Sequence, residues 1–143
     1  MADVHDKKTR SFNMSRIRAK DTKPEMTVRR FLHAKGLRYK LHDKSLAGKP
    51  ELVFPKYNTV LFVNGCFWHG HENCRYFRLP KTKTEWWRNK IETTKEKDRQ
   101  NTYALQADGW NTLEVFECQL KKHSAESTLN SLYHNIINGN TDN

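Results

Sequence analysis

The stretch ELVFPKYNTVLFVN, residues 51–64, decides the fold class of this chain. It holds two short apolar runs, ELVFP and TVLFVN, which the turn-forming residues PKYN separate. Both runs are β-prone and apolar on both faces, which is typical of central strands covered on either side. We therefore expect two buried strands in this stretch.

Helical patterns and weaker strand patterns surround this pair of strands. The order predicts a three-layer α/β domain in which helices flank a small mixed β-sheet, with residues 21–143 forming one domain. The other expected elements are a helix that Asp21 or Thr22 caps and that ends near Gly36, a strand over Leu37 to His42, a long helix that Thr82 or Thr84 caps and that ends before Gly109, a strand over Asn111 to Phe116, and a helix from Ser124 to about Asn138.

The composition favours a polyanionic partner. The chain of 143 residues carries 26 Lys and Arg against 16 Asp and Glu, a formal net charge of +10. Nucleic acid is the expected partner, and a basic but solvated surface is the alternative. No apolar run approaches the ~20 residues of a membrane span, and the N-terminus lacks the apolar segment of a signal peptide, so we expect a cytoplasmic protein.

Residues 1–20 are basic and contain few apolar anchors. This composition predicts an arm that orders on a phosphate backbone, whereas a tail without function is the alternative. The expected backbone-contacting residues are Lys7, Lys8, Arg10, Arg16 and Arg18.

The segment NGCFWHGHENC, residues 64–74, concentrates metal-binding side chains. Cys66, His71 and Cys74 lie close in sequence, and Cys118 follows the expected strand 111–116. Three cysteines in a reducing compartment fit a disulfide framework poorly, and thiolates with an imidazole suit tetrahedral Zn²⁺. A structural zinc site is the favoured interpretation. Otherwise Cys66 and Cys118 are small buried hydrophobes and His71 is a surface histidine.

Several carboxylates occupy positions where a surface charge is not expected. Glu51 starts an apolar strand, Asp98 shares a helical stripe with Ile91 and Leu105, and Glu25 shares the inward side of the first helix. Carboxylates that converge would form a Mg²⁺ site, because Mg²⁺ prefers oxygen ligands. The alternatives are buried salt bridges or, for Glu25, stabilisation of a helix N-terminus.

Aromatic pairs precede His69 and open the long helix. Phe67 and Trp68 form the first pair, and Trp86 and Trp87 form the second. In a basic protein such pairs could stack on bases or wedge between them, whereas core packing is the alternative. Trp87 belongs to the inward stripe, so Trp86 is expected to be the freer of the two.

Taken together, these motifs resemble the very-short-patch mismatch repair (Vsr) endonucleases over nearly the whole chain. The segments that carry the resemblance are MADVHDKKTRSFNM (1–14), GKPELVF (48–54), VNGCFWHGHENC (63–74), PKTKTEWW (80–87), EKDRQ (96–100) and FEC (116–118). The resemblance implies a restriction-endonuclease-like fold and an enzyme that nicks DNA beside the thymine of a T:G mismatch. Such mismatches arise when 5-methylcytosine deaminates, and the nick starts the repair.

The resemblance also implies residue roles. Glu51 falls on the family's metal-binding aspartate, His69 on its catalytic histidine, and Glu25 and Asp98 on acidic helpers. The cysteines and His71 match the zinc ligands, Phe67, Trp68 and Trp87 match intercalating aromatics, and the N-terminal arm matches a DNA clasp. Two departures stand out: Pro50-Glu51 replaces the usual Pro-Asp, and Asn64 stands where a histidine or an acid is usual.

These observations define three hypotheses. The first is a Mg²⁺-dependent endonuclease that nicks T:G mismatches, acts as a monomer in the bacterial cytoplasm at the nucleoid, and works beside other mismatch-repair proteins. The second, which the departures at Glu51 and Asn64 motivate, is a weakened or inactive member that binds mismatched or bent DNA without cutting. The third is a basic zinc-stabilised nucleic-acid-binding domain without a mismatch preference.

Overall fold

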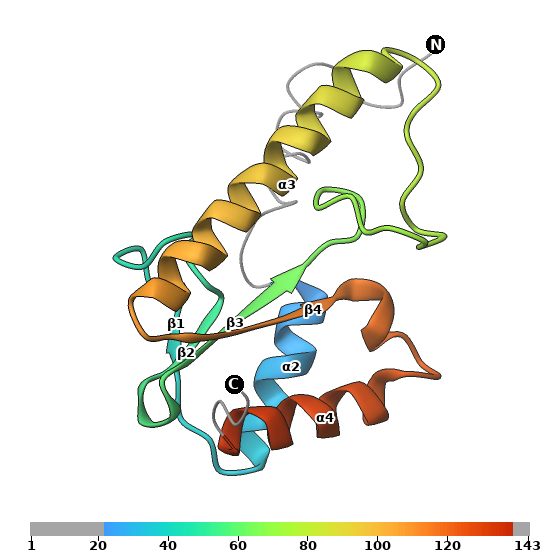
Figure 1. Ribbon diagram of the computed structural model, residues 1–143. Helices are drawn as coiled ribbons and strands as arrows, with labels where there is room; N and C mark the ends of the chain where they lie inside the picture. The colour runs from blue at the N-terminus through green and yellow to red at the C-terminus, as the bar shows by residue number, and fades with distance from the viewer. Residues whose placement is uncertain (1–21, 139–143) are drawn as a thin grey trace, which may run out of the picture.

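The structure, a computed structural model, describes residues 22–138 (Figure 1). Its order of helix, strands, helix, strand and helix agrees with the sequence prediction. The elements are α2 (Lys23–Ala34), β1 (Lys40–Leu41), β2 (Leu52–Phe54), the 3-10 turn η1 (Pro55–Tyr57), β3 (Thr59–Asn64), α3 (Thr84–Ala107), β4 (Asn111–Phe116), the 3-10 turn η2 (Glu117–Leu120) and α4 (Ala125–Ile137).

The strands form one mixed sheet in the order β1-β2-β3-β4. β1, β2 and β3 pair in antiparallel fashion, and β4 runs parallel to β3 with Leu61 opposite Leu113. The expected pair of central strands is confirmed, because all of β2 and nearly all of β3 are buried. Asn58, with a φ of 50°, turns the chain from η1 into β3.

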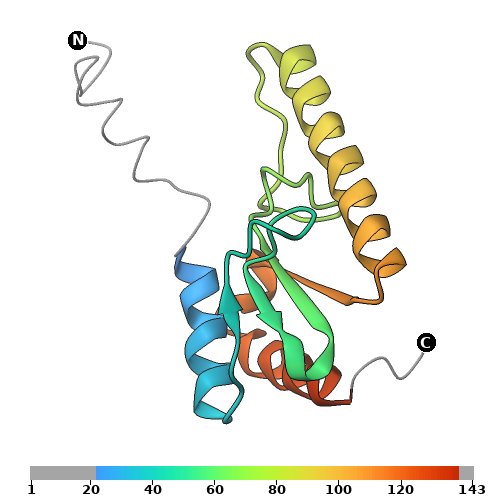
Figure 2. The ribbon, with the colours of Figure 1, turned by 90° about the vertical axis from the view of Figure 1, so that its left-hand side faces the viewer.

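Helices cover both faces of the sheet. On one face, Leu52 and Leu61 pack in a core with Leu32 of α2 and Leu132 of α4. On the other face, Val60 packs with Leu105 of α3 and other apolar side chains. Figure 2 shows the sheet between α3 on one side and α2 and α4 on the other. The expectation of an α/β domain with helices flanking a small mixed sheet is confirmed.

Three local expectations need correction. The strand expected over Leu37 to His42 shrinks to Lys40–Leu41, because His42 adopts a left-handed φ of 48° that ends it. Neither expected threonine caps α3: Lys83 occupies the N-cap position, and the Thr84 hydroxyl donates to the Pro80 carbonyl instead. Ser124 does precede α4, but its side chain makes no capping hydrogen bond.

The cap of α2 is confirmed at Thr22, whose hydroxyl accepts a hydrogen bond from the Glu25 amide at 3.3 Å. The predicted basic arm, residues 1–20, lies outside the described residues, as do Asp21 and residues 139–143. Among the helices of residues 22–138, none has the length and apolar character to span a membrane.

Candidate active site and metal centre

The four predicted zinc ligands meet at one point. Cys66, His71 and Cys74 lie on the loop that follows β3, and Cys118 lies on η2 after β4. Their ligand atoms all lie within 4.8 Å of one another, and no other such cluster occurs in residues 22–138. Since β3 and β4 are parallel neighbours, their chain ends deliver the loop and η2 to the same edge of the sheet. This cluster could hold a metal ion.

The surroundings of the sulfur atoms fit metal-bound thiolates. Backbone amides donate to two of them, from Cys118 to the Cys66 sulfur and from Tyr76 to the Cys74 sulfur, both at 3.4 Å. Such bonds favour the charged form of the acceptor. Burial nonetheless raises the pKa of Cys66 to about 12, so a bound cation would be needed to keep its thiolate at neutral pH.

Two contacts hold the imidazole ring of His71 in place. Its ring stacks on Phe116 with centroids 3.8 Å apart and an interplanar angle of 3°, and its Nδ1 lies 3.4 Å from the Cys118 sulfur. Three thiols and one imidazole supply the four donors that structural zinc sites use. The donor set therefore fits zinc with every coordination position filled by protein.

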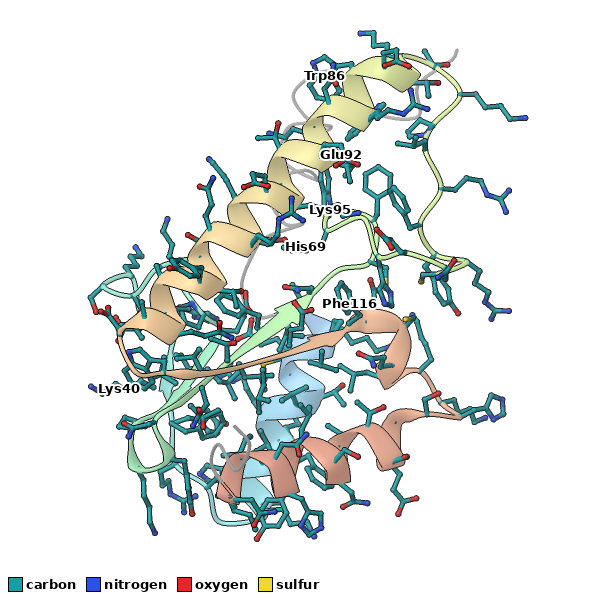
Figure 3. All side chains as sticks on the ribbon, in the orientation of Figure 1. Lys40, His69, Trp86, Glu92, Lys95 and Phe116 are labelled. Atoms are coloured by element: carbon teal, nitrogen blue, oxygen red, sulfur yellow. The ribbon has the colours of Figure 1, made fainter. Side chains whose placement is uncertain are left out.

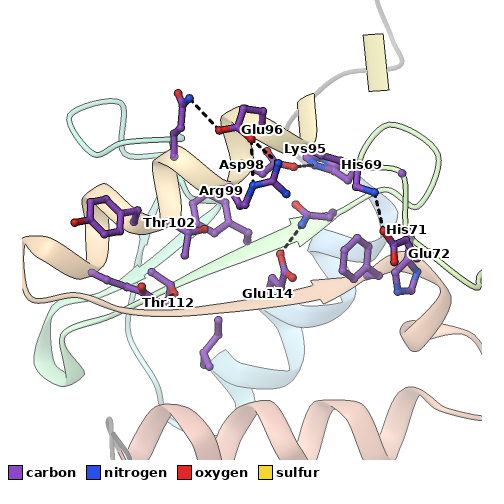
Figure 4. A pocket seen from close by; sticks show the side chains of 18 residues that line it. His69, His71, Glu72, Lys95, Glu96, Asp98, Arg99, Thr102, Thr112 and Glu114 are labelled. Carbon is purple, nitrogen blue, oxygen red and sulfur yellow. Dashed lines mark hydrogen bonds and ion pairs between the residues drawn. The ribbon is translucent and has the colours of Figure 1, made fainter. Parts of the chain in front are cut away.

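His69 pairs with Asp98 of α3. The histidine Nδ1 lies 2.7 Å from the aspartate Oδ2, and Figure 4 shows the two side chains meeting across the space between the loop and α3. Because a carboxylate only accepts, Nδ1 carries the hydrogen and Nε2 remains for another partner. The loop can approach α3 this closely because Gly70, with φ +58°, has no side chain: an added Cβ would lie 2.5 Å from Ile91.

The pair lines a cleft of about 920 Å³ between α3 and the β3–β4 part of the sheet. Asp98 was expected on a core-facing stripe, but its side chain is 39% exposed at this cleft. Leu105 of α3 packs in the core against the sheet, whereas Asp98, two turns earlier in the helix, faces the cleft. Glu72, on the loop after β3, is an exposed partner of Lys95.

Glu51 lies directly before β2, and its side chain reaches across to β3. The Val63 amide donates to its Oε1 at 2.7 Å. Burial raises the pKa of Glu51 to about 7, against the lowering effect of this amide; the charge of Glu25 raises it further and that of His69 lowers it. The structure therefore brings Glu51, Glu25 and His69 within electrostatic reach of one another.

Glu25 is almost fully buried, with 1% of its surface exposed. Its Oε2 accepts hydrogen bonds from the His42 ring at 2.7 Å and from Arg29 at 3.4 Å. The alternative of a buried salt bridge is thus realised for Glu25. Sequence reasoning missed His42, although it pairs with Glu51 when the β1–β2 register is continued by one residue.

Asn64 ends β3 and lines the cleft. It is 7% exposed, and its side-chain amide donates to Glu114 of β4 at 3.2 Å. Glu114, a second residue that sequence reasoning missed, sits directly across from Phe62 in the parallel register. Asn64 thus presents an amide where an ionisable group was expected, and its amide nitrogen is engaged by a neighbouring acid.

The aromatic residues form one cluster between the loop and the projecting end of α3. Phe67 lies 5.2 Å from Trp68 and 5.3 Å from Trp87 by ring centroids, and Trp86 lies 4.9 Å from Trp87. Trp68 and Trp86 are 47% and 57% exposed, which confirms Trp86 as the freer of its pair. Figure 3 shows Trp86 on the far part of α3, beyond His69. The aromatics therefore extend from the histidine toward solvent.

Comparison with known proteins places this chain in a family. The model of the family described as "DNA mismatch endonuclease Vsr" matches residues 2–75. DNA mismatch endonuclease Vsr of Escherichia coli (strain K12) is 46% identical over 121 residues, 85% of this chain and 77% of that protein. Type II nicking enzyme V.XorIIP of Xanthomonas oryzae pv. oryzae is 44% identical over 120 residues, 84% of this chain and 88% of that protein. Type II nicking enzyme V.NmeAIP of Neisseria meningitidis serogroup A is 42% identical over 137 residues, 95% of this chain and 97% of that protein. The chain belongs to the Vsr family of DNA mismatch endonucleases.

Proposed function

We propose that this protein nicks one strand of duplex DNA beside the thymine of a T:G mismatch and so starts very short patch repair. Membership of the Vsr family supports DNA cleavage in general. The observation that carries the finer proposal is one juxtaposition: the His69–Asp98 pair lies within reach of Glu51 and next to an exposed aromatic cluster. A phosphodiester and the neighbouring base stack could thus be engaged together.

Mg²⁺ fits the carboxylate site. Mg²⁺ is usually bound through only one or two carboxylates together with substrate phosphate, and Glu51 supplies one such carboxylate. Glu51, with Glu25 nearby, would hold the ion. When bound there, Mg²⁺ supplies Lewis-acid polarisation of the phosphoryl group and charge stabilisation for the leaving oxygen.

His69 acts in our proposal as a general base. Asp98 accepts from Nδ1 and thereby presents Nε2, which takes a proton from the attacking water as its oxygen bonds to phosphorus and the bond from phosphorus to the leaving sugar oxygen breaks. Asp98 also fixes the orientation of the ring. The role of acidic helper that the family resemblance implies for Glu25 is indirect in this proposal, because its Oε2 already accepts hydrogen bonds from His42 and Arg29.

The aromatic cluster supplies mismatch preference in this proposal. Trp68 and Trp86 are exposed, and Phe67 and Trp87 support them from below. Inserting a side chain between base pairs costs a few kcal/mol of stacking, and this cost is least where a mismatch already disturbs the stack. We also propose that the arm carrying Lys7, Lys8, Arg10, Arg16 and Arg18 contacts the phosphate backbone.

The Cys66 cluster holds Zn²⁺ as a structural ion in our proposal, within a restriction-endonuclease-like fold and a chain that acts as a monomer. Four protein donors leave no position for a catalytic water. A closed zinc site would fix Phe67, Trp68 and His69 relative to one another. We expect the protein to act on chromosomal DNA in the bacterial cytoplasm, and other mismatch-repair proteins are the expected partners.

A nicking assay tests the proposal. Labelled duplexes with one T:G mismatch and matched T:A duplexes are incubated with the zinc-loaded protein with and without Mg²⁺, beside a binding titration of each duplex. Mg²⁺-dependent nicking of the T:G duplex alone supports the proposal. Tight T:G binding without a nick would favour a protein that binds the mismatch but does not cut. The departures from the family pattern at Glu51 and Asn64 motivate that alternative. Equal affinity for both duplexes would leave a general DNA-binding domain.

A further inference from the structure

His42 contacts two of the acidic residues, Glu51 and Glu25. It follows β1, and its backbone amide donates to the Glu51 carbonyl at 3.0 Å, which extends the β1–β2 ladder by one residue. Its left-handed φ of 48° ends the strand at this residue. The backbone of His42 therefore fixes the backbone of Glu51.

The ring of the same residue holds Glu25. His42 Nε2 lies 2.7 Å from Glu25 Oε2, and the acceptor is a carboxylate, so Nε2 carries the donated hydrogen. The two side chains are 20% and 1% exposed, which shields the bond from solvent. One residue thus contacts Glu51 through its backbone and Glu25 through its ring.

This arrangement matters because like charges repel, so two carboxylates that are to bind one ion must each be held in place by another group. The Val63 amide orients the Glu51 side chain, but Glu25 projects from a different element, α2. A donor fixed to the Glu51 backbone can hold Glu25 in a set position relative to Glu51.

We propose that His42 is a positioning residue of the active site, which sets the Glu25 carboxylate relative to Glu51 and thereby the affinity of this pair for Mg²⁺. The inference rests on the proposed function and deepens it. His42 acts through Glu25 and does not itself reach the substrate. Removing such an outer partner of a metal-binding group typically costs about 10- to 100-fold in metal affinity or activity.

Two substitutions separate positioning from mere structural support. His42→Asn keeps a residue that tolerates the left-handed backbone but shortens the side chain, so that the bond to Glu25 is lost. His42→Gln restores a longer side chain with an amide donor and is expected to recover most of the function. His33→Asn is the matched control, because His33 is an exposed histidine of α2 whose ring faces Tyr39.

The readouts are kcat and KM for the T:G duplex, the Mg²⁺ concentration for half-maximal nicking, and the rise in melting temperature that Mg²⁺ causes without DNA. We expect His42→Asn to lower kcat at least about tenfold at fixed Mg²⁺, to leave KM for the duplex unchanged, and to raise the Mg²⁺ requirement by a similar factor. The melting temperature without Mg²⁺ should fall in His42→Asn, because the buried Glu25 loses a donor, so the Mg²⁺-induced rise is measured against each variant's own Mg²⁺-free value. His42→Gln should reverse the losses.

Several results would overturn the inference. These are a wild-type Mg²⁺ response in His42→Asn, equal impairment of His42→Gln, or a change in KM alone. Absence of nicking by the wild type would defeat the proposed function but not this test, because the Mg²⁺-induced rise in melting temperature still compares wild type with His42→Asn. A wild type whose melting temperature does not respond to Mg²⁺ would overturn the inference as well.

Discussion

The sulfur centre and the carboxylate centre lie at the same end of the sheet but are built on opposite plans. In the sulfur centre, the ligand atoms of Cys66, His71, Cys74 and Cys118 all lie within 4.8 Å of one another. In the carboxylate centre each acid is held by its own protein donor: Glu51 by Val63, Glu25 by His42, and Asp98 by His69. A closed set suits a structural ion, whereas separately held acids beside a cleft leave room for a substrate phosphate.

The largest expected effect is that of a substitution at Cys118 in the sulfur centre. Cys118→Ser should release zinc and unfold much of the loop after β3, because structural zinc binding supplies on the order of 10 kcal/mol of folding free energy. The measurements are metal content of the purified protein and its melting temperature. The exposed His123→Ala variant serves as the control. Unchanged metal content and stability in Cys118→Ser would remove the structural-zinc claim.

His69 should give the opposite outcome, although it lies only two residues from His71, a proposed zinc ligand. His69→Ala should reduce nicking by roughly 10²- to 10⁴-fold, the usual contribution of a general base. Zinc content and affinity for the T:G duplex should change little, because His69 contacts Asp98 and not the sulfur cluster. Single-turnover nicking and a binding titration measure the two effects. A fully active variant would exclude His69 from the mechanism.

Glu51 tests whether ionising a buried carboxylate without a bound cation lowers the free energy of unfolding. A folded-state pKa of about 7 against an ordinary 4.5 means that the folded protein holds this proton more tightly than the unfolded chain. Its contribution to stability is therefore present below about pH 4.5 and is lost as the pH rises through 7, by up to about 3 kcal/mol. Denaturant unfolding between pH 5 and pH 8 in the absence of Mg²⁺ should show this decline.

Glu51→Gln should flatten that decline, since glutamine does not ionise and its carbonyl can still accept from Val63. Glu72→Gln is the control, because Lys95 holds the pKa of the exposed Glu72 below its ordinary value. Saturating Mg²⁺ should also flatten the decline in the wild type by favouring the ionised carboxylate. A pH profile of stability that is the same for wild type and Glu51→Gln would show that ionisation of Glu51 does not lower the free energy of unfolding.

The two centres also differ in how far sequence predicts them. The sulfur ligands follow from residue type and the order of strands, because only a few side chains have that chemistry and two parallel strands bring them together. The sequence indicates unusually placed carboxylates, but it does not predict their surroundings. By its spacing Asp98 falls on an apolar stripe of α3. Leu105 of that stripe is in the core against the sheet, but the Asp98 side chain is 39% exposed.

His42 shows the remaining gap most clearly. Its link to Glu25 depends on the β1–β2 register, on a left-handed backbone and on the approach of α2, and no local pattern encodes these together. Helices and strands were predictable because periodicity reflects which side is buried. Contacts between polar side chains from different elements depend on tertiary packing, which periodicity does not specify.

The smallest expected effect concerns Glu51, where the chain departs from the Pro-Asp of the family pattern. Sequence reasoning expects Glu51→Asp to raise activity if the extra methylene is harmful. In the structure, however, the longer side chain is what allows Oε1 to reach the Val63 amide at 2.7 Å. We therefore expect Glu51→Asp to lower kcat, by about tenfold, the equivalent of one hydrogen bond to a charged group of roughly 1.5 kcal/mol. The control is Glu126→Asp, at an exposed acid in the first turn of α4, and single-turnover nicking is the measurement. A gain in rate for Glu51→Asp would mean that the carboxylate centre is built for the shorter acid and that the Val63 bond holds Glu51 away from its working position.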